Sequence, residues 1–209
     1  MNVQSLAGAF GAVSAVMDKN RDYLIQLDQQ NGDGDLGISM SSGFRAVKEY
    51  LSENTGGERD LGRLLMKSGS LFNEAAPSSL GTIISMGMMG MARSLKGKEE
   101  AGLADLAAAM EAGLASIMEK AKSKPGEKTV LDALCPGVEA LKKASGGDIK
   151  GAFAAAAAAA AEGSENTKNM KAVHGRAAFY GEKSIGVLDG GSVAGKLIFE
   201  GLNQYAGGL

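Results

Sequence analysis

The first two amphipathic segments of the chain are separated by the polar stretch Asp28-Gln-Gln-Asn-Gly-Asp33-Gly-Asp35-Leu-Gly-Ile-Ser-Met40. Before it, apolar residues recur at intervals of three, four and seven: Leu6, Phe10, Val13, Met17, Leu24 and Leu27. This spacing predicts one long amphipathic helix with Asp28 near its C-terminal end. After the stretch, Phe44, Val47 and Leu51 line a second helix. The stretch therefore predicts a tight loop between two packed helices.

The same helical spacing continues to the end of the chain, and no segment shows the strict alternation of a β-strand. Further helices are expected from about Arg59 to before Pro77, from Ser78-Ser79, over Leu103–Lys122, over Glu127–Lys143, from near Asp148 and from about Ser192. Eight helices with short connections predict an all-α fold, an antiparallel up-and-down bundle or barrel. We expect residues 1–209 to form a single domain.

Composition narrows the class of protein. The chain is 44% hydrophobic, which suffices for one core. Its formal net charge is −2, and it has no basic patch that would favour nucleic-acid binding. Its one cysteine, Cys135, excludes an internal disulfide. The first residues do not resemble a signal peptide, and no apolar run is long enough for a membrane span. We expect a soluble, cytoplasmic protein.

Three carboxylates, those of Asp28, Asp33 and Asp35, fall within eight residues, with glycines between them. Carboxylates this close repel one another unless a cation lies between them, and Mg²⁺ and Ca²⁺ prefer oxygen ligands. A helix that begins near Gly37 would direct free N–H groups and the positive end of its dipole at an anion. A metal site beside a helix start predicts phosphate binding.

Two other interpretations of this loop compete with a metal site. An EF-hand needs Gly at its sixth position and Glu at its twelfth, and counted from Asn31 these positions are Leu36 and Ser42. An EF-hand is therefore excluded. A polar turn capped by aspartates needs no ligand, because Asp and Gly are common turn residues. That interpretation stays open on the stretch alone.

Two expected helix starts carry further candidates. Ser78 and Ser79 have hydroxyls that either cap a helix or hold a phosphate, and both roles fit equally well. At the other start, Gly126 permits the close approach of a flat ring, with Thr129 and Cys135 beside it.

The longest irregular stretch runs from His174 to Gly191. Arg176 is its natural phosphate contact, because a guanidinium group is always charged. The alternative is a surface ion pair between Arg176 and Glu182. His174, the only histidine, has no neighbouring Ser or Cys nucleophile, so we interpret it as structural.

With these stretches in place, the chain resembles the ADP-binding L subunit, or L domain, of dihydroxyacetone kinases. The resemblance covers nearly the whole chain, and four glycine-rich stretches occur in the family's order. The carboxylate loop is similar to the family's metal loop, and residues 126–132 resemble its GDKTMLDAL signature. Residues 175–177, 181–186 and 189–191 resemble its GRASYLGERSIGHQDPG stretch.

The resemblance implies a barrel of eight antiparallel helices that binds ADP or ATP among the loops at one end. It implies that Asp28, Asp33 and Asp35 hold two Mg²⁺ ions that bridge the phosphates. The residues that it assigns to the nucleotide are Leu36, Gly37, Ile38, Ser39, Ser78, Ser79, Gly126, Thr129, Cys135, Arg176, Asp189, Gly190 and Gly191. Of these, residues 36–39 and the serine pair would cradle phosphates, Gly126 and Cys135 would flank the adenine, and the last four would close the pocket.

The resemblance also implies a partner, a K-type subunit that holds a small ketose and receives the phosphoryl group at this end. Two donors stay open: exchangeable ATP, or fixed ADP that a phosphotransferase-system protein rephosphorylates. A homodimer is also left open.

Three departures from the family pattern leave the substrate, donor and partner open: Leu36 replaces a histidine, Lys183 an arginine and Gly190 a proline. A ketotetrose or another small polyol ketone fits such a divergent member. The rival hypotheses are a non-catalytic, regulatory module that binds nucleotide and a purely structural bundle.

Overall fold

The computed structural model describes residues 1–209, except for the side chain of Asn31. Over this described part, the chain forms α-helices and two 3₁₀ segments and no strand. The elements are α1 (Val3–Lys19), α2 (Arg21–Asn31), α3 (Leu36–Glu53), α4 (Leu61–Ala75), α5 (Ser79–Ser94), α6 (Leu103–Ala121), α7 (Leu131–Lys143), α8 (Ile149–Asn166), η1 (Thr167–Asn169), η2 (Arg176–Ser184) and α9 (Gly190–Gly207). The predicted all-α fold is confirmed.

The expected long first helix is two helices, so the number eight was approximate. The break lies at Asn20, whose side-chain Nδ2 donates to the carbonyl of Val16 at 2.9 Å while its backbone leaves the helical conformation (φ −101°, ψ 9°). Asparagine competes in this way with the backbone of a helix. The short helix α2 can therefore take a direction of its own and carry Asp28 to the end of the barrel.

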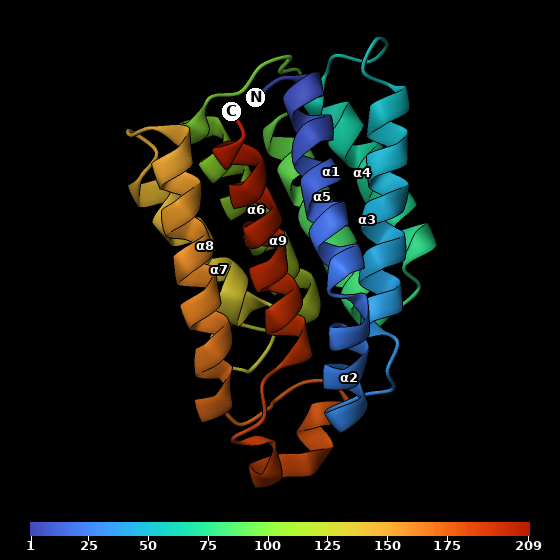
Figure 1. Cartoon of the computed structure of the whole chain (residues 1–209), viewed down its shortest axis with the longest axis vertical. Helices are drawn as coiled ribbons and strands as arrows, with labels where there is room; N and C mark the ends of the chain where they lie inside the picture. Colours follow the sequence, from blue (N-terminus) through green and yellow to red (C-terminus); the bar gives the residue numbers. More distant parts are fainter.

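The helices alternate in direction, which separates the connecting loops into two sets (Figure 1). One end holds both termini, and there the backbones of Met1 and Ala101 exchange two hydrogen bonds. The opposite end holds α2 and the segment that contains η2, drawn in orange. Loops 32–35, 76–78, 122–130 and 167–189 belong to this second end. All the stretches singled out in the sequence therefore lie at one end of the molecule.

The core of the barrel is apolar and incompletely filled. Phe44 packs edge-on against Phe72, with ring centroids 4.9 Å apart. A cavity of about 390 Å³ lies between the helices and is lined by apolar side chains that include Phe10, Met88 and Phe153. No helix in the described part of the chain combines the length and the apolar character that crossing a bilayer requires. The barrel thus supplies a rigid frame for the polar loops at its end.

Candidate metal and phosphate site

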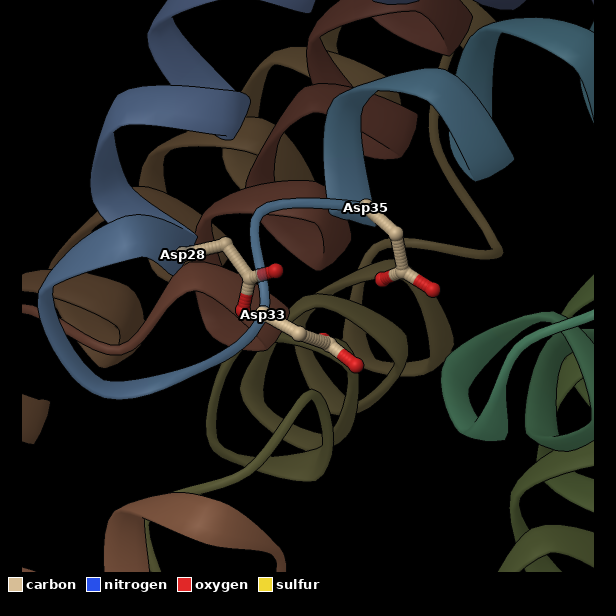
Figure 2. Close-up of side chains that lie close together, drawn as sticks. All are labelled: Asp28, Asp33 and Asp35. Atoms are coloured by element: carbon tan, nitrogen blue, oxygen red, sulfur yellow. The ribbon is translucent and has the colours of Figure 1, made fainter.

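The three carboxylates of the first loop gather into one cluster. Asp28 lies on α2, Asp33 in the loop and Asp35 at the N-cap of α3, and one carboxylate oxygen of each lies within 4.8 Å of the others (Figure 2). Oδ2 of Asp28 accepts hydrogen bonds from the backbone N–H groups of Gly34 (2.8 Å) and Leu36 (3.4 Å). Asp35 makes no capping hydrogen bond with its side chain. The loop is thus wrapped around Asp28, and its oxygens fit the oxygen-rich shell that Mg²⁺ or Ca²⁺ takes.

The electrostatics of this cluster favour a cation. Partial burial raises the pKa of Asp35, and the neighbouring charges of Asp33 and Asp28 raise it further, while Arg176 acts in the opposite direction. Like charges held together disfavour the ionised form of each group. A bound cation would remove this repulsion and would favour the ionised carboxylates.

Arg176, the first residue of η2, reaches the same cluster. Its Nη2 lies 2.8 Å from Oδ2 of Asp33. The alternative ion pair with Glu182 is not formed, since Arg176 points to Asp33, and Glu182 pairs with Lys171 at 2.8 Å instead. The structure therefore brings a guanidinium group to the carboxylate cluster.

The first turn of α3 follows the cluster directly. Leu36, Gly37 and Ser39 are buried, whereas Ile38 is exposed. A Cβ added at Gly37 would lie 2.1 Å from the carbonyl oxygen of Arg21, so only glycine lets α3 begin this close to α2. The first N–H groups of a helix lack partners within it, which makes this turn a candidate anion site.

Ser78 and Ser79 lie at the same end of the barrel. Ser78 is the N-cap of α5, and its Oγ accepts from the N–H of Gly81 at 3.1 Å. In the described part of the chain, neither serine hydrogen-bonds to another predicted site residue. The capping role is thus realised in the structure, and the phosphate role of the pair stays a prediction.

The loop before α7 is organised by Asp132, a residue that the sequence analysis did not single out. Its carboxylate accepts from the N–H groups of Gly126 (2.5 Å) and Thr129 (2.7 Å). Gly126 and Lys128 have φ values of +92° and +60°. These left-handed residues interrupt the helix expected from Glu127, and α7 begins at Leu131 instead. The spacing Thr129-x-x-Asp132 resembles a capping box and could have revealed Asp132.

Cys135 lies one turn further along α7 and is partly buried. Burial, with a contribution from the charge of Asp132, raises the pKa of its thiol to about 11. A thiol of this kind is a weak nucleophile at neutral pH. Cys135 packs against the hydrophobic core, and its raised pKa disfavours covalent chemistry.

The Asp189-Gly190-Gly191 turn meets both of these loops. Asp189 caps α9 by accepting from the N–H of Ser192 at 2.6 Å. Burial raises the pKa of Asp189 to about 6. A Cβ at Gly190 would lie 2.8 Å from the side chain of Leu36, and one at Gly191 would lie 3.4 Å from the backbone nitrogen of Val130. The start of α9 is thus wedged between the start of α3 and the loop before α7.

His174 has the structural role that the sequence suggested. Its Nε2 lies 2.6 Å from Oε2 of Glu127, and the N–H of Val173 donates to the Glu127 carbonyl at 3.3 Å. The hydrogen bond from His174 is the main reason that the pKa of Glu127 is lowered. This contact ties the segment that carries Arg176 to the loop that carries Gly126.

Comparisons with known proteins agree with this picture. The family model described as the DAK2 domain matches residues 30–204. The chain is 35% identical to "PEP-dependent dihydroxyacetone kinase 2, ADP-binding subunit DhaL" of Listeria innocua, over 86% of this chain and 84% of the relative. It is 31% identical to the corresponding subunit of kinase 1 from the same organism, over 90% and 89%.

Among solved structures, the dihydroxyacetone kinase of C. freundii in its native form superposes with a TM-score of 0.77 at 24% identity. The match covers 98% of this chain but 34% of the solved chain. This likeness supports the barrel fold, and the chain corresponds to about a third of that larger protein.

Proposed function

This chain belongs to the DhaL family of DAK2-domain proteins, and on that premise we propose that it is the nucleotide-binding subunit of a two-component phosphotransferase that phosphorylates a small ketose. The observation that carries the proposal is the carboxylate cluster of Asp28, Asp33 and Asp35, with ligand atoms within 4.8 Å of one another beside a helix start. A metal–phosphate site explains why three repelling acids are held together.

We assign the residues at this end of the barrel as follows. Asp28, Asp33 and Asp35 hold Mg²⁺, which we propose as two ions, and these supply charge neutralisation for the phosphates. The first turn of α3, residues 36–39, donates backbone N–H groups to the phosphates. Ser78 and Ser79 add hydroxyls beside them.

The other end of the nucleotide is assigned to α7 and its preceding loop. Gly126 and Cys135 flank the adenine, and Thr129 lies beside them. The Asp189-Gly190-Gly191 turn closes the site. Such an arrangement supplies positioning and charge stabilisation, which are what phosphoryl transfer mainly requires.

The guanidinium group of Arg176 changes its partner when the site is filled. Without a ligand, it pairs with Asp33 at 2.8 Å, and both side chains are substantially exposed. When Asp33 becomes a metal ligand, the guanidinium is free to contact the phosphate that is transferred. A guanidinium near that phosphate stabilises the charge of the transition state.

The acceptor comes from a partner. We propose that a K-type subunit supplies it, because the chain resembles the ADP-binding subunit of kinases that hold the ketose on a separate subunit. Phe179 is 91% exposed and Tyr180 48% exposed, both in η2 just after Arg176. Exposed aromatic side chains are typical anchors of protein interfaces. They support docking of the K-type subunit next to the phosphates.

The descriptions of the relatives support one of the two phosphoryl donors. Both Listeria subunits carry the description "PEP-dependent". This favours the variant in which bound ADP stays in place and is rephosphorylated by a phosphotransferase-system protein. Exchange with free ATP is the competing variant.

The test is reconstitution of the reaction. The purified chain is combined with a K-type subunit and dihydroxyacetone or erythrulose, and either ATP or phosphoenolpyruvate with the phosphotransferase-system proteins is supplied. We expect phosphorylated ketose with phosphoenolpyruvate and none when Asp35→Ala replaces the wild-type chain. Nucleotide binding without transfer under either donor would instead indicate a regulatory module, the alternative that the Leu36 replacement leaves open.

A further inference from the structure

Lys128 is a buried lysine for which the proposed chemistry has no use. It is 3% exposed, and its backbone is left-handed with a φ of +60°. Removal from water lowers its pKa, and the charges of Asp189 and Asp132 oppose that effect. A buried ammonium group is costly unless it is fully hydrogen-bonded, so its position calls for an explanation.

The ammonium group is satisfied by three backbone carbonyls from distant parts of the chain. Nζ donates to the carbonyl oxygens of Thr167 (2.7 Å), Val187 (2.5 Å) and Met170 (3.3 Å). An ammonium has three N–H donors, so these acceptors use all of them. Lys128 therefore joins three segments: the loop before α7, the η1 region and the segment before α9.

Each of the three segments adjoins a part of the candidate site. Lys128 itself stands between Gly126 and Thr129, and Val187 precedes Asp189 by two residues. Thr167 completes the connection, because its Oγ1 accepts from the N–H of Asp189 at 3.2 Å. The lysine thus sets the spacing between the loop assigned to the adenine and the turn that closes the site.

We infer that Lys128 is a positioning residue, which holds the Gly126–Thr129 loop and the Asp189–Gly191 turn in the register that the nucleotide requires. The inference rests on the proposed function, since it concerns the same site. If so, Lys128 supports the adenine side of the site and not the carboxylate loop. The carboxylate loop is held by Asp28 through Gly34 and Leu36, without contact to Lys128. Removing the lysine should therefore impair nucleotide binding and spare metal binding.

The first test compares Lys128→Met with Lys168→Met in the full chain. Lys168 is a matched control, because it lies in η1 but pairs with Glu165 at the surface. We expect the Kd for ADP in the presence of Mg²⁺ to rise roughly 10- to 100-fold in Lys128→Met, as is typical for residues that orient a site indirectly. Binding of Mn²⁺ alone should be unchanged in both variants. Lys128→Arg keeps the charge and should regain part of the lost affinity.

Unchanged affinity for ADP in a folded Lys128→Met variant would overturn the inference. A second measurement keeps the test decisive if that variant does not fold. Amide hydrogen exchange of the wild-type chain is followed with and without ADP and Mg²⁺. We expect ADP to protect residues 126–130 and 186–190. We also expect protection of residues 167–170, which have no assigned contact with the nucleotide and are linked to the site through Lys128.

The pattern of exchange also separates this inference from the proposed function. Protection of residues 33–39, 126–130 and 186–190 without protection of 167–170 would overturn the role of Lys128 and leave the proposed nucleotide site standing. No protection anywhere, including residues 33–39, would reject the proposed nucleotide site and the role of Lys128 with it.

Discussion

The guanidinium of Arg176 lies 2.8 Å from the carboxylate of Asp33, which joins the segment before α9 to the loop before α3. Both partners are exposed enough for water and salt to weaken the pair, so its own contribution to stability is small. Its significance lies in the place where it puts a permanent positive charge. The arginine partly offsets three crowded carboxylates and lies beside the site that we propose for a metal-bound phosphate.

Replacing Arg176 by glutamine should separate its contact with the phosphate from its competition with the metal for Asp33. We expect the affinity for ADP with Mg²⁺ to fall roughly 10- to 100-fold, which corresponds to the loss of a charge-assisted hydrogen bond. Binding of Mn²⁺ alone should be equal or tighter, because Asp33 loses a competing cation. Calorimetric titration measures both. Arg45→Gln is the matched control, since Arg45 pairs with Asp18 at 2.9 Å on the surface, and it should change neither value.

Neutralising the cluster should stabilise the fold and abolish the site. In the double variant Asp33→Asn with Asp35→Asn, the repulsion within the cluster disappears. The free energy of unfolding without metal should rise by on the order of 1 kcal/mol. Thermal unfolding with and without Mg²⁺ and ADP measures the effect, and only the wild-type chain should gain stability from the ligands. A ligand-induced rise in Tm of similar size in the variant would argue against a metal site here.

Asp189 should make stability depend on pH. Its pKa is raised from 3.8 to about 6, so the folded state favours the protonated acid. This contribution is fully present below about pH 4 and is lost as the pH rises through 6. Asp189→Asn can still cap α9 but does not titrate. Relative to that variant, the wild-type chain should lose about 2 kcal/mol of unfolding free energy between pH 4 and pH 7, as measured by urea denaturation. Parallel curves for the two proteins would contradict this.

Cys135 offers a chemical test of the adenine side. With a thiol pKa of about 11, its alkylation by iodoacetamide at pH 7.5 should be roughly 100-fold slower than that of free cysteine. ADP with Mg²⁺ should slow it further if the thiol flanks the base. The same addition should have no effect on Asp35→Ala, which serves as the control. Alkylation that ADP does not slow in the wild-type chain would remove Cys135 from the site.

The fold was predictable because apolar spacing is a local property of a helix. The stripe from Leu6 to Leu27 and the serine pair at Ser78 both marked helices that the structure contains. Up-and-down topology then brings alternate loops to one end, so polar stretches far apart in sequence gather there. The spacing of Asp28, Asp33 and Asp35 likewise predicted that their carboxylates lie together, and the structure gathers them across the turn from α2 to α3.

The break in the first helix, the start of α7 and the burial of Lys128 depend on contacts that sequence spacing does not encode. The break at Asn20 follows from one side-chain hydrogen bond to Val16. The late start of α7 follows from the capture of two loop N–H groups by Asp132. The burial of Lys128 could not be predicted, because its three acceptors are backbone carbonyls of remote residues, and backbone groups carry no sequence signal.

The central claim is that this end of the barrel binds a nucleotide through a metal. Its most direct test is calorimetric titration of the purified chain with ADP and ATP, with and without Mg²⁺, after any nucleotide carried through purification has been identified. We expect binding that requires Mg²⁺ and disappears in Asp35→Ala, whose helical content by circular dichroism stays that of the wild-type chain. Absence of Mg²⁺-dependent binding of either nucleotide to the wild-type chain would contradict it.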